Sequence, residues 1–224
     1  MNETTAKHTG PDNGGHVSLA SELYEEFGLE SQLAFEAFDQ ALKGYETLDH
    51  QKEILTIIDF SKPSTEERMF VLDMRDRRIL YQTIVSHGRN SGDKYARKFS
   101  NRHGSFQSSL GFYLTANTYI GGNGYSLVID GLEKGINDQA RARAVVIHGA
   151  DYCSEEFIRR TGRLGRSYGC PALPRELNEE IINTIKGGSL LYIYAEDEQY
   201  AMNSSILKET ASEKAASLAG TSYL

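Results

Sequence analysis

Cys170 lies in a glycine-rich segment, residues 165–171, that reads Gly-Arg-Ser-Tyr-Gly-Cys-Pro. Glycines beside a cysteine let the backbone approach a ligand closely, and the N–H groups of such a turn can face an oxyanion. Arg163 and Arg166 are near in sequence, and positive charge favours the thiolate, which is the nucleophilic form. The pattern predicts a reactive cysteine. The alternative is a buried, inert cysteine in a tight turn.

His148 closes a short apolar run, residues 144–148, and Gly149 follows it. A histidine at the end of a buried strand is well placed to act as a general base. A cysteine paired with a histidine has a depressed pKa and becomes a strong nucleophile. Two interpretations therefore have equal weight: a nucleophile–base pair of Cys170 and His148, or a strand-end histidine with a structural hydrogen bond.

Cys153, the second cysteine, lies in a segment without a comparable motif. It is interpreted as a small buried residue, or as a disulfide partner of Cys170, which would remove the nucleophile. A zinc set of His87, His148 and the two cysteines is a third interpretation. Its spacing matches no paired-ligand pattern, so no metal site is predicted. For His87, in the polar segment 86–92, substrate contact or loop structure is favoured over catalysis.

Short runs rich in β-branched and apolar residues predict strands along most of the chain. They lie at residues 54–58, 69–73, 78–85, 111–115, 126–129, 144–148 and 190–194. Because few helices intervene, the pattern favours a β-rich sandwich or barrel over βαβ units. Two long polar stretches, 86–110 and 161–174, are predicted to be functional loops.

Helical spacing of apolar residues over 18–47 predicts two helices joined near Gly28. Ser18 and Ser31 are the predicted N-caps, while Gly28 and Gly44 are the predicted C-terminal stops. A further helix is predicted over 175–186, after a proline that presets the backbone angle at its start.

Composition and charge bound the class of protein. The chain has 224 residues and a formal net charge of −7, whereas a nucleic-acid binder usually shows a basic excess. No apolar run approaches the roughly 18 residues of a membrane span. We expect a disordered leader (1–16) without a signal peptide, a helical segment (17–48), a main domain (49–195) and a C-terminal tail (196–224).

The sequence resembles the L,D-transpeptidase catalytic domain family, which has the YkuD-like fold, and its YkuD_2 branch in particular. The resemblance covers about residues 30–195 and rests on a histidine-glycine pair followed by Ser-x-Gly-Cys, in this order and spacing. The matching stretches are residues 57–64, 86–92, 99–101, 108–113, 146–150 and 165–173.

The resemblance implies a β-rich (α+β) catalytic domain, a YkuD-like sandwich or barrel over residues 49–195. It makes Cys170 the nucleophile and His148 the base, with the Gly149 carbonyl holding the histidine tautomer. Backbone N–H groups near Gly169 and Cys170 would stabilise the oxyanion. The residues expected to shape the loop or contact substrate are Ser167, Tyr168, Arg163, Arg166 and His87.

In this family the enzyme cleaves the third peptide bond of a peptidoglycan stem tetrapeptide, releases D-Ala and passes the acyl group to an amine. Peptidoglycan stem peptides are thus the expected partner, no cofactor is implied, and the expected site of action is the cell envelope, with the signal peptide removed. Many members carry an arginine where this chain has Ala172, so the charge of Arg163 or Arg166 is expected to replace it.

Three alternatives to transfer stay open at this point. An L,D-carboxypeptidase would hydrolyse the same acyl-enzyme with water. A catalytically silent peptidoglycan-binding module is disfavoured by the intact Cys170 and His148. A cytosolic thiol hydrolase is favoured by the missing signal peptide alone.

Overall fold

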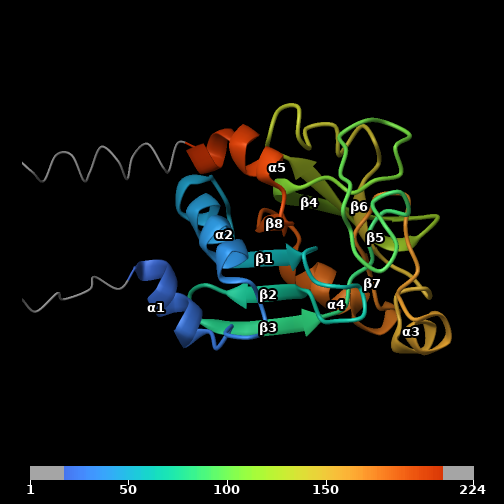
Figure 1. The fold of residues 1–224 in the computed structure, drawn as a ribbon, viewed down its shortest axis with the longest axis horizontal. Helices are drawn as coiled ribbons and strands as arrows, with labels where there is room; N and C mark the ends of the chain where they lie inside the picture. The colour runs from blue at the N-terminus through green and yellow to red at the C-terminus, as the bar shows by residue number, and fades with distance from the viewer. Residues whose placement is uncertain (1–17, 209–224) are drawn as a thin grey trace, which may run out of the picture.

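One mixed sheet of eight strands forms the centre of the fold (Figure 1). The computed structural model describes residues 18–208. The strands are β1 (Ile54–Asp59), β2 (Met69–Asp73), β3 (Arg78–Thr83), β4 (Gly111–Gly121), β5 (Gly124–Gly131), β6 (Val146–Gly149), β7 (Ala172–Leu173) and β8 (Leu190–Tyr194). They are hydrogen-bonded in the order β3-β2-β1-β8-β4-β5-β6-β7, and the sheet is nearly barrel-shaped. The predicted β-rich α+β class is confirmed.

Two strand pairs in this sheet are parallel, and both join distant parts of the chain. β8 pairs in parallel with β1, and β7 pairs in parallel with β6, while the remaining pairs are antiparallel. Parallel pairs cannot be closed by a hairpin, so each requires a long connection. The connection between β6 and β7, residues 150–171, contains a short helix (Glu155–Thr161) and then the glycine-rich loop that carries Cys170.

Around the sheet, the named helices of the described residues are α1 (Leu19–Glu26), α2 (Phe35–Thr47), α3 (Glu155–Thr161), α4 (Arg175–Ile185) and α5 (Glu198–Asn203). α2 packs on β1 and β8, and α1 packs on α2. α4 packs on β5 and β6, which fixes the strand that carries His148. Within residues 18–208, no helix combines the length and the apolar character that a bilayer span requires.

The two N-terminal helices form where the sequence predicts them, but two of the four predicted end signals are wrong. The Ser18 side chain accepts from the Ser21 N–H and caps α1, and Gly28, with φ +65°, follows the end of that helix. Ser31 caps nothing, because α2 begins only at Phe35. Gly44 lies inside α2, where it admits the ring of Phe112.

Helices α3 and α5 were not predicted, because both are short and carry a weak apolar pattern. α5 falls in the segment expected to be a tail, yet its Tyr200 is buried and donates to the buried carboxylate of Glu133 (3.1 Å). Glu133 also accepts from the N–H of Phe112 (2.8 Å) and the hydroxyl of Ser204 (2.5 Å). The predicted leader (1–16) and most of the predicted tail lie outside the described residues.

Replacing Gly44 by alanine tests this packing. An alanine normally stabilises a helix interior by about 1 kcal/mol relative to glycine. Here a Cβ would lie 2.0 Å from Cε1 of Phe112, so we expect a loss of about 1–3 kcal/mol from overpacking. Urea unfolding measures the difference, with Gly122→Ala as the control because a Cβ there meets nothing within 4 Å. Stabilisation by Gly44→Ala would show that the helix can move away from Phe112.

Candidate active site

Cys170 is held at the end of the loop that leads into β7. Its Sγ accepts a hydrogen bond from the N–H of Val146 at 3.4 Å and contacts the carbonyl oxygen of Ala144 at 3.7 Å. Both groups belong to the segment that enters β6. The side chain is partly buried and forms no disulfide. The thiol is therefore fixed against the strand that carries His148.

His148 lies on β6 in register with Ala172 of β7, two residues beyond Cys170. The ring is 4% exposed, and its Nδ1 lies 3.0 Å from the carbonyl oxygen of Gly149. A carbonyl only accepts, so Nδ1 carries the proton and Nε2 of the neutral ring keeps a lone pair. The structure thus brings His148, Gly149 and the Cys170 loop to one edge of the sheet, and the contact of His148 with the Gly149 carbonyl agrees with the role that the resemblance implies for Gly149.

Burial sets the protonation of both candidate residues. It raises the pKa of the Cys170 thiol, against smaller opposite effects of the Val146 N–H, the charge of Arg143 and the N–H of Cys170 itself. It also lowers the pKa of His148. Near neutral pH the resting pair is therefore an uncharged thiol and an uncharged imidazole. The prediction of a depressed thiol pKa is wrong for the resting protein, because loss of hydration outweighs the nearby positive charge.

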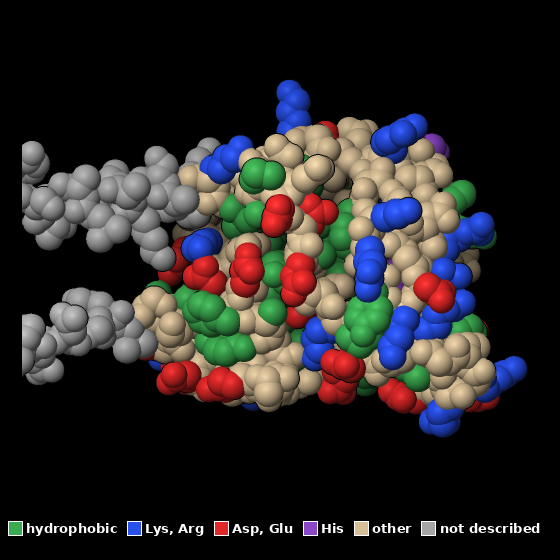
Figure 2. All heavy atoms as spheres, viewed as in Figure 1, with side chains coloured by type: hydrophobic (Ala, Val, Ile, Leu, Met, Phe, Trp, Pro, Cys, Tyr) green, Lys and Arg blue, Asp and Glu red, His purple; other side chains and the backbone are tan. Residues whose placement is uncertain are grey.

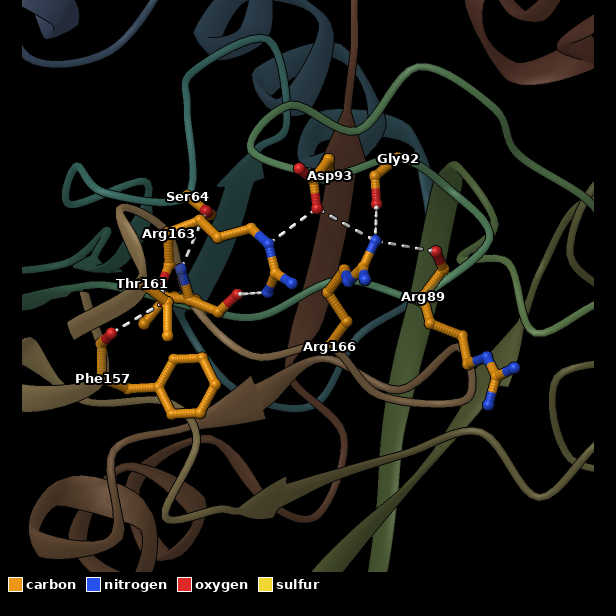
Figure 3. Close-up of polar contacts among 9 residues, drawn as sticks. Ser64, Arg89, Gly92, Asp93, Phe157, Thr161, Arg163 and Arg166 are labelled. Carbon is orange, nitrogen blue, oxygen red and sulfur yellow. Dashed lines mark hydrogen bonds and ion pairs between the residues drawn. The ribbon is translucent and has the colours of Figure 1, made fainter.

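Arg163 and Arg166, the predicted sources of that charge, point instead toward Asp93 (Figure 3). Arg163 Nε lies 2.6 Å and Arg166 Nη1 3.2 Å from the same carboxylate oxygen, and Arg166 also donates to the carbonyl of Gly92 at 2.9 Å. Neither arginine is among the groups that shift the Cys170 pKa. Many family members carry an arginine at the position of Ala172, and we expected Arg163 or Arg166 to supply its charge. The pKa of the Cys170 thiol gives no support for this expectation.

Arg163 and Arg166 line a hollow of about 580 Å³. Its other walls are Arg89, Asn90, Tyr152, Phe157 and Gly165. Figure 2 shows Lys and Arg side chains gathered on the right of the molecule, where β5, β7 and α3 lie in Figure 1. The hollow therefore combines a basic wall with an aromatic one, although the chain as a whole is acidic.

Arg143 is a site residue that the sequence analysis missed. Its Nη1 donates to the carbonyl of Ser100 and the hydroxyl of Ser109, each at 2.6 Å, and its Nη2 donates to the carbonyl of Gln107, also at 2.6 Å. The guanidinium thereby holds the loop 100–109, and its charge lowers the pKa of Cys170. In the sequence, Arg143 lies in an Ala-Arg repeat before a strand, and this pattern does not indicate a role near the thiol.

Ser167 and Tyr168 differ in their environments. The Ser167 hydroxyl donates to the carbonyl of Cys170 at 2.6 Å and accepts from the N–H of Gly169 at 3.0 Å. Its predicted role in shaping the loop is consistent with these contacts. Tyr168 is 67% exposed and packs against the ring of Phe106, where it is available to a ligand. The Gly169 N–H, one of the two predicted oxyanion donors, is already occupied by Ser167.

His87 is buried, with 1% of its surface exposed. Its Nδ1 accepts from Nη2 of the fully buried Arg68 at 2.9 Å, and its ring packs edge-on against Phe60. Burial first, and then the charge of Arg68, lowers the pKa of His87 to about 3. These contacts support the loop-structure interpretation of His87 over direct substrate contact.

Cys153 is fully buried, and burial raises its pKa to about 12. Both cysteines are free, so they form no disulfide with each other. The part of the chain from 18 to 208 contains no group of three His, Cys, Asp or Glu side chains that could hold a metal ion.

The sequence matches the YkuD_2 family model, described as the L,D-transpeptidase catalytic domain, over residues 29–194. The chain belongs to this family. Solved structures with a similar fold include an L,D-transpeptidase from Mycobacterium smegmatis, with 14% identity, 64% of this chain and 59% of that chain covered, and a TM-score of 0.39. No curated protein sequence matches.

Two further structures have similar sequence identity, coverage and TM-score. The helical cell shape determining protein from Campylobacter jejuni has 12% identity, covers 66% of this chain and 49% of its own, and has a TM-score of 0.44. An Enterococcus faecium L,D-transpeptidase has 14% identity, 64% and 50% coverage, and a TM-score of 0.39. The chain thus spans between about half and three-fifths of the length of these structures.

The pH dependence of Cys170 alkylation tests the electrostatics of the site. Because burial raises the thiol pKa, we expect the iodoacetamide rate to rise with pH, with a midpoint above the free-thiol value of about 8.5. Arg143→Gln removes a charge that favours the thiolate, so its midpoint lies higher still. Mass spectrometry of the Cys170 peptide gives the rates. The control is Arg141→Gln, because Arg141 is exposed and paired with Asp130. A wild-type midpoint below the free-thiol value would contradict the expected direction.

Replacing His87 by alanine separates a structural role from a binding role. The variant leaves a cavity and removes one of the two acceptors of Nη2 of Arg68, which keeps the Val85 carbonyl, so we expect a loss of about 2–4 kcal/mol in the free energy of unfolding. Turnover per folded molecule should change little. Calorimetry and kinetics on the same samples measure both quantities. An unchanged melting temperature with a raised KM would instead assign His87 to substrate binding.

Proposed function

We propose that this chain is a peptidoglycan L,D-transpeptidase that acts in the cell envelope through an acyl-enzyme on Cys170. The observation that carries the proposal is the β6–β7 edge. There His148, with Nδ1 held by the Gly149 carbonyl, lies in register with the strand that Cys170 precedes. The resting state of a nucleophile–base pair is a neutral histidine and a protonated thiol, and the pKa directions of His148 and Cys170 agree with it.

In the first half-reaction, His148 Nε2 takes the Sγ proton as Sγ adds to the carbonyl carbon of the donor stem peptide. The carbonyl electron pair moves to oxygen, and the Cys170 N–H is the donor that faces this oxyanion. When the intermediate collapses, the C–N bond breaks and the imidazolium protonates the leaving amine of D-Ala. A thioester on Cys170 remains, and His148 is neutral again.

In the second half-reaction, the acceptor amine attacks the thioester while His148 removes a proton from it. Collapse of this intermediate breaks the C–S bond, and the imidazolium returns the proton to Sγ. Acyl transfer through a thiol requires no cofactor, and His148 passes each proton that it takes to the leaving group of the same half-reaction. If water replaces the amine, the same steps give an L,D-carboxypeptidase.

The basic hollow beside the loop gives this proposal a place for a charged substrate. Guanidinium groups bind carboxylates through paired, charge-assisted hydrogen bonds. Arg89 stacks over the rings of Phe106 and Tyr168. The Arg166 guanidinium makes its contacts through Nη1. We assign Arg163, Arg166 and Tyr168 to the recognition of carboxylate-bearing stem peptides.

Incubation with purified muropeptides tests the proposal. With tetrapeptide donors, mass spectrometry should show loss of D-Ala and a cross-linked product, together with an acyl adduct on Cys170. Cys170→Ala should abolish both, and Cys153→Ala should keep most of the activity because Cys153 is buried away from solvent. Loss of D-Ala without a cross-link would assign the carboxypeptidase reaction. Activity retained in Cys170→Ala would overturn the mechanism.

A further inference from the structure

Serine hydroxyls hold two neighbouring backbone carbonyl groups, that of Gly169 and that of Cys170. Ser167 Oγ donates to the carbonyl of Cys170 at 2.6 Å, within the loop itself. Ser108 Oγ donates to the carbonyl of Gly169 at 3.0 Å from a loop that is distant in sequence. The orientation of the Gly169–Cys170 peptide plane is therefore fixed from outside its own segment.

This fixed carbonyl determines where the Cys170 N–H points. The peptide bond is trans, so its C=O and N–H point in opposite directions within the peptide plane. With the Gly169 carbonyl directed at Ser108, the Cys170 N–H must face the other side. Within residues 18–208 this N–H meets no acceptor beyond its own thiol, and the Gly169 N–H is occupied by Ser167. The Cys170 N–H is therefore open to a ligand.

Gly169 allows the Gly169–Cys170 peptide plane to rotate easily. Its φ of +128° lies in a region that glycine enters at little cost, so the peptide that follows could rotate without a side-chain clash. The protein needs an external contact to keep one orientation. Ser108 is the residue that makes this contact.

Ser108 is itself held so that its hydroxyl has one direction. The residue is 1% exposed, its Oγ accepts from the N–H of Gly88 at 3.0 Å, and its own N–H donates to Ser91 Oγ at 2.9 Å. Arg143 fixes the preceding residue by donating to the carbonyl of Gln107. With its acceptor role filled by Gly88, the hydroxyl proton goes to the Gly169 carbonyl.

We propose that Ser108 is a positioning residue for acyl transfer, whose hydroxyl keeps the Cys170 N–H directed at the oxygen of the carbonyl under attack. The proposal rests on the assignment of Cys170 as the nucleophile. When Sγ bonds to the carbonyl carbon, the electron pair moves to the oxygen, and the directed N–H stabilises that charge until the leaving group departs. Alkylation by iodoacetamide displaces iodide and forms no oxyanion, so it does not depend on Ser108.

The test compares acylation with alkylation in the intact chain. p-Nitrophenyl acetate acylates Cys170 through an oxyanion, and release of p-nitrophenolate gives the rate, with the acetyl group located by mass spectrometry. Loss of an oxyanion donor costs about 10²–10³ in rate. For Ser108→Ala, which misdirects the donor without deleting it, we expect a loss of about 10–100-fold, with the alkylation rate within about twofold of wild type.

Ser109→Ala is the matched control. Ser109 is equally buried and contacts Arg143 and the carbonyl of Ser100, but it makes no contact with Gly169. We expect its acylation rate to stay within about threefold of wild type. If Ser108→Ala proves unstable, Ser108→Thr and Ser108→Val replace it. They share one shape and differ in the hydroxyl, so the threonine variant should be acylated faster, by about 10-fold or more.

Among the variants, three results would overturn the proposal: acylation of Ser108→Ala at the wild-type rate, equal losses in acylation and alkylation, or an equal loss of acylation in Ser109→Ala. Absence of acetyl transfer to Cys170 in the wild type would also overturn it. These outcomes are independent of the muropeptide experiment. Acetylation that depends on Ser108, without any change in muropeptides, would uphold the positioning role and refute the proposed substrate.

Discussion

The pairing of β6 with the two-residue strand β7 is the contact on which the candidate site depends. So short a strand supplies few hydrogen bonds of its own, and it is held from both sides. His148 and Gly149 lie in register with it on one side, while the N–H of Ser86 donates to the carbonyl of Ala172 at 2.9 Å on the other. The position of Cys170 is thus fixed by backbone contacts on both sides of β7, with β6 on one side and the isolated bridge of Ser86 on the other.

Burial around this edge gives the resting site an uncharged character. A thiolate and an imidazolium would each lose hydration here, and the pKa directions of Cys170 and His148 both reflect that cost. In the proposed reaction, charge develops as the proton moves between them. It would then meet groups that are already oriented: the N–H of Val146, the N–H of Cys170 and the guanidinium of Arg143. Such preorganised groups need no reorientation during the reaction.

Residue types and local pattern were enough to predict the β-rich class, most strands and both N-terminal helices, and they pointed to Cys170 and His148 as a candidate pair. The roles of Arg143 and Ser108 were not predictable, because each depends on contacts between segments far apart in the sequence. Gly44 shows the same limit inside an element. Glycine is a helix stop by local rules, but here the approach of Phe112 decides its use. The charge on Cys170 was misjudged because sequence proximity shows nearby arginines but does not show burial or the pairing with Asp93.

The place of β8 has a consequence for how the molecule is assembled. This strand, residues 190–194, is the last of the sheet to be synthesised, yet it lies at the centre between β1 and β4. Until it emerges, β1–β3 and β4–β7 have no shared hydrogen-bonded edge, and each half exposes an unpaired strand. Loop closure across such long separations makes this step slow. The nascent chain therefore carries two incomplete half-sheets, which the same five residues both join and protect from pairing with other chains.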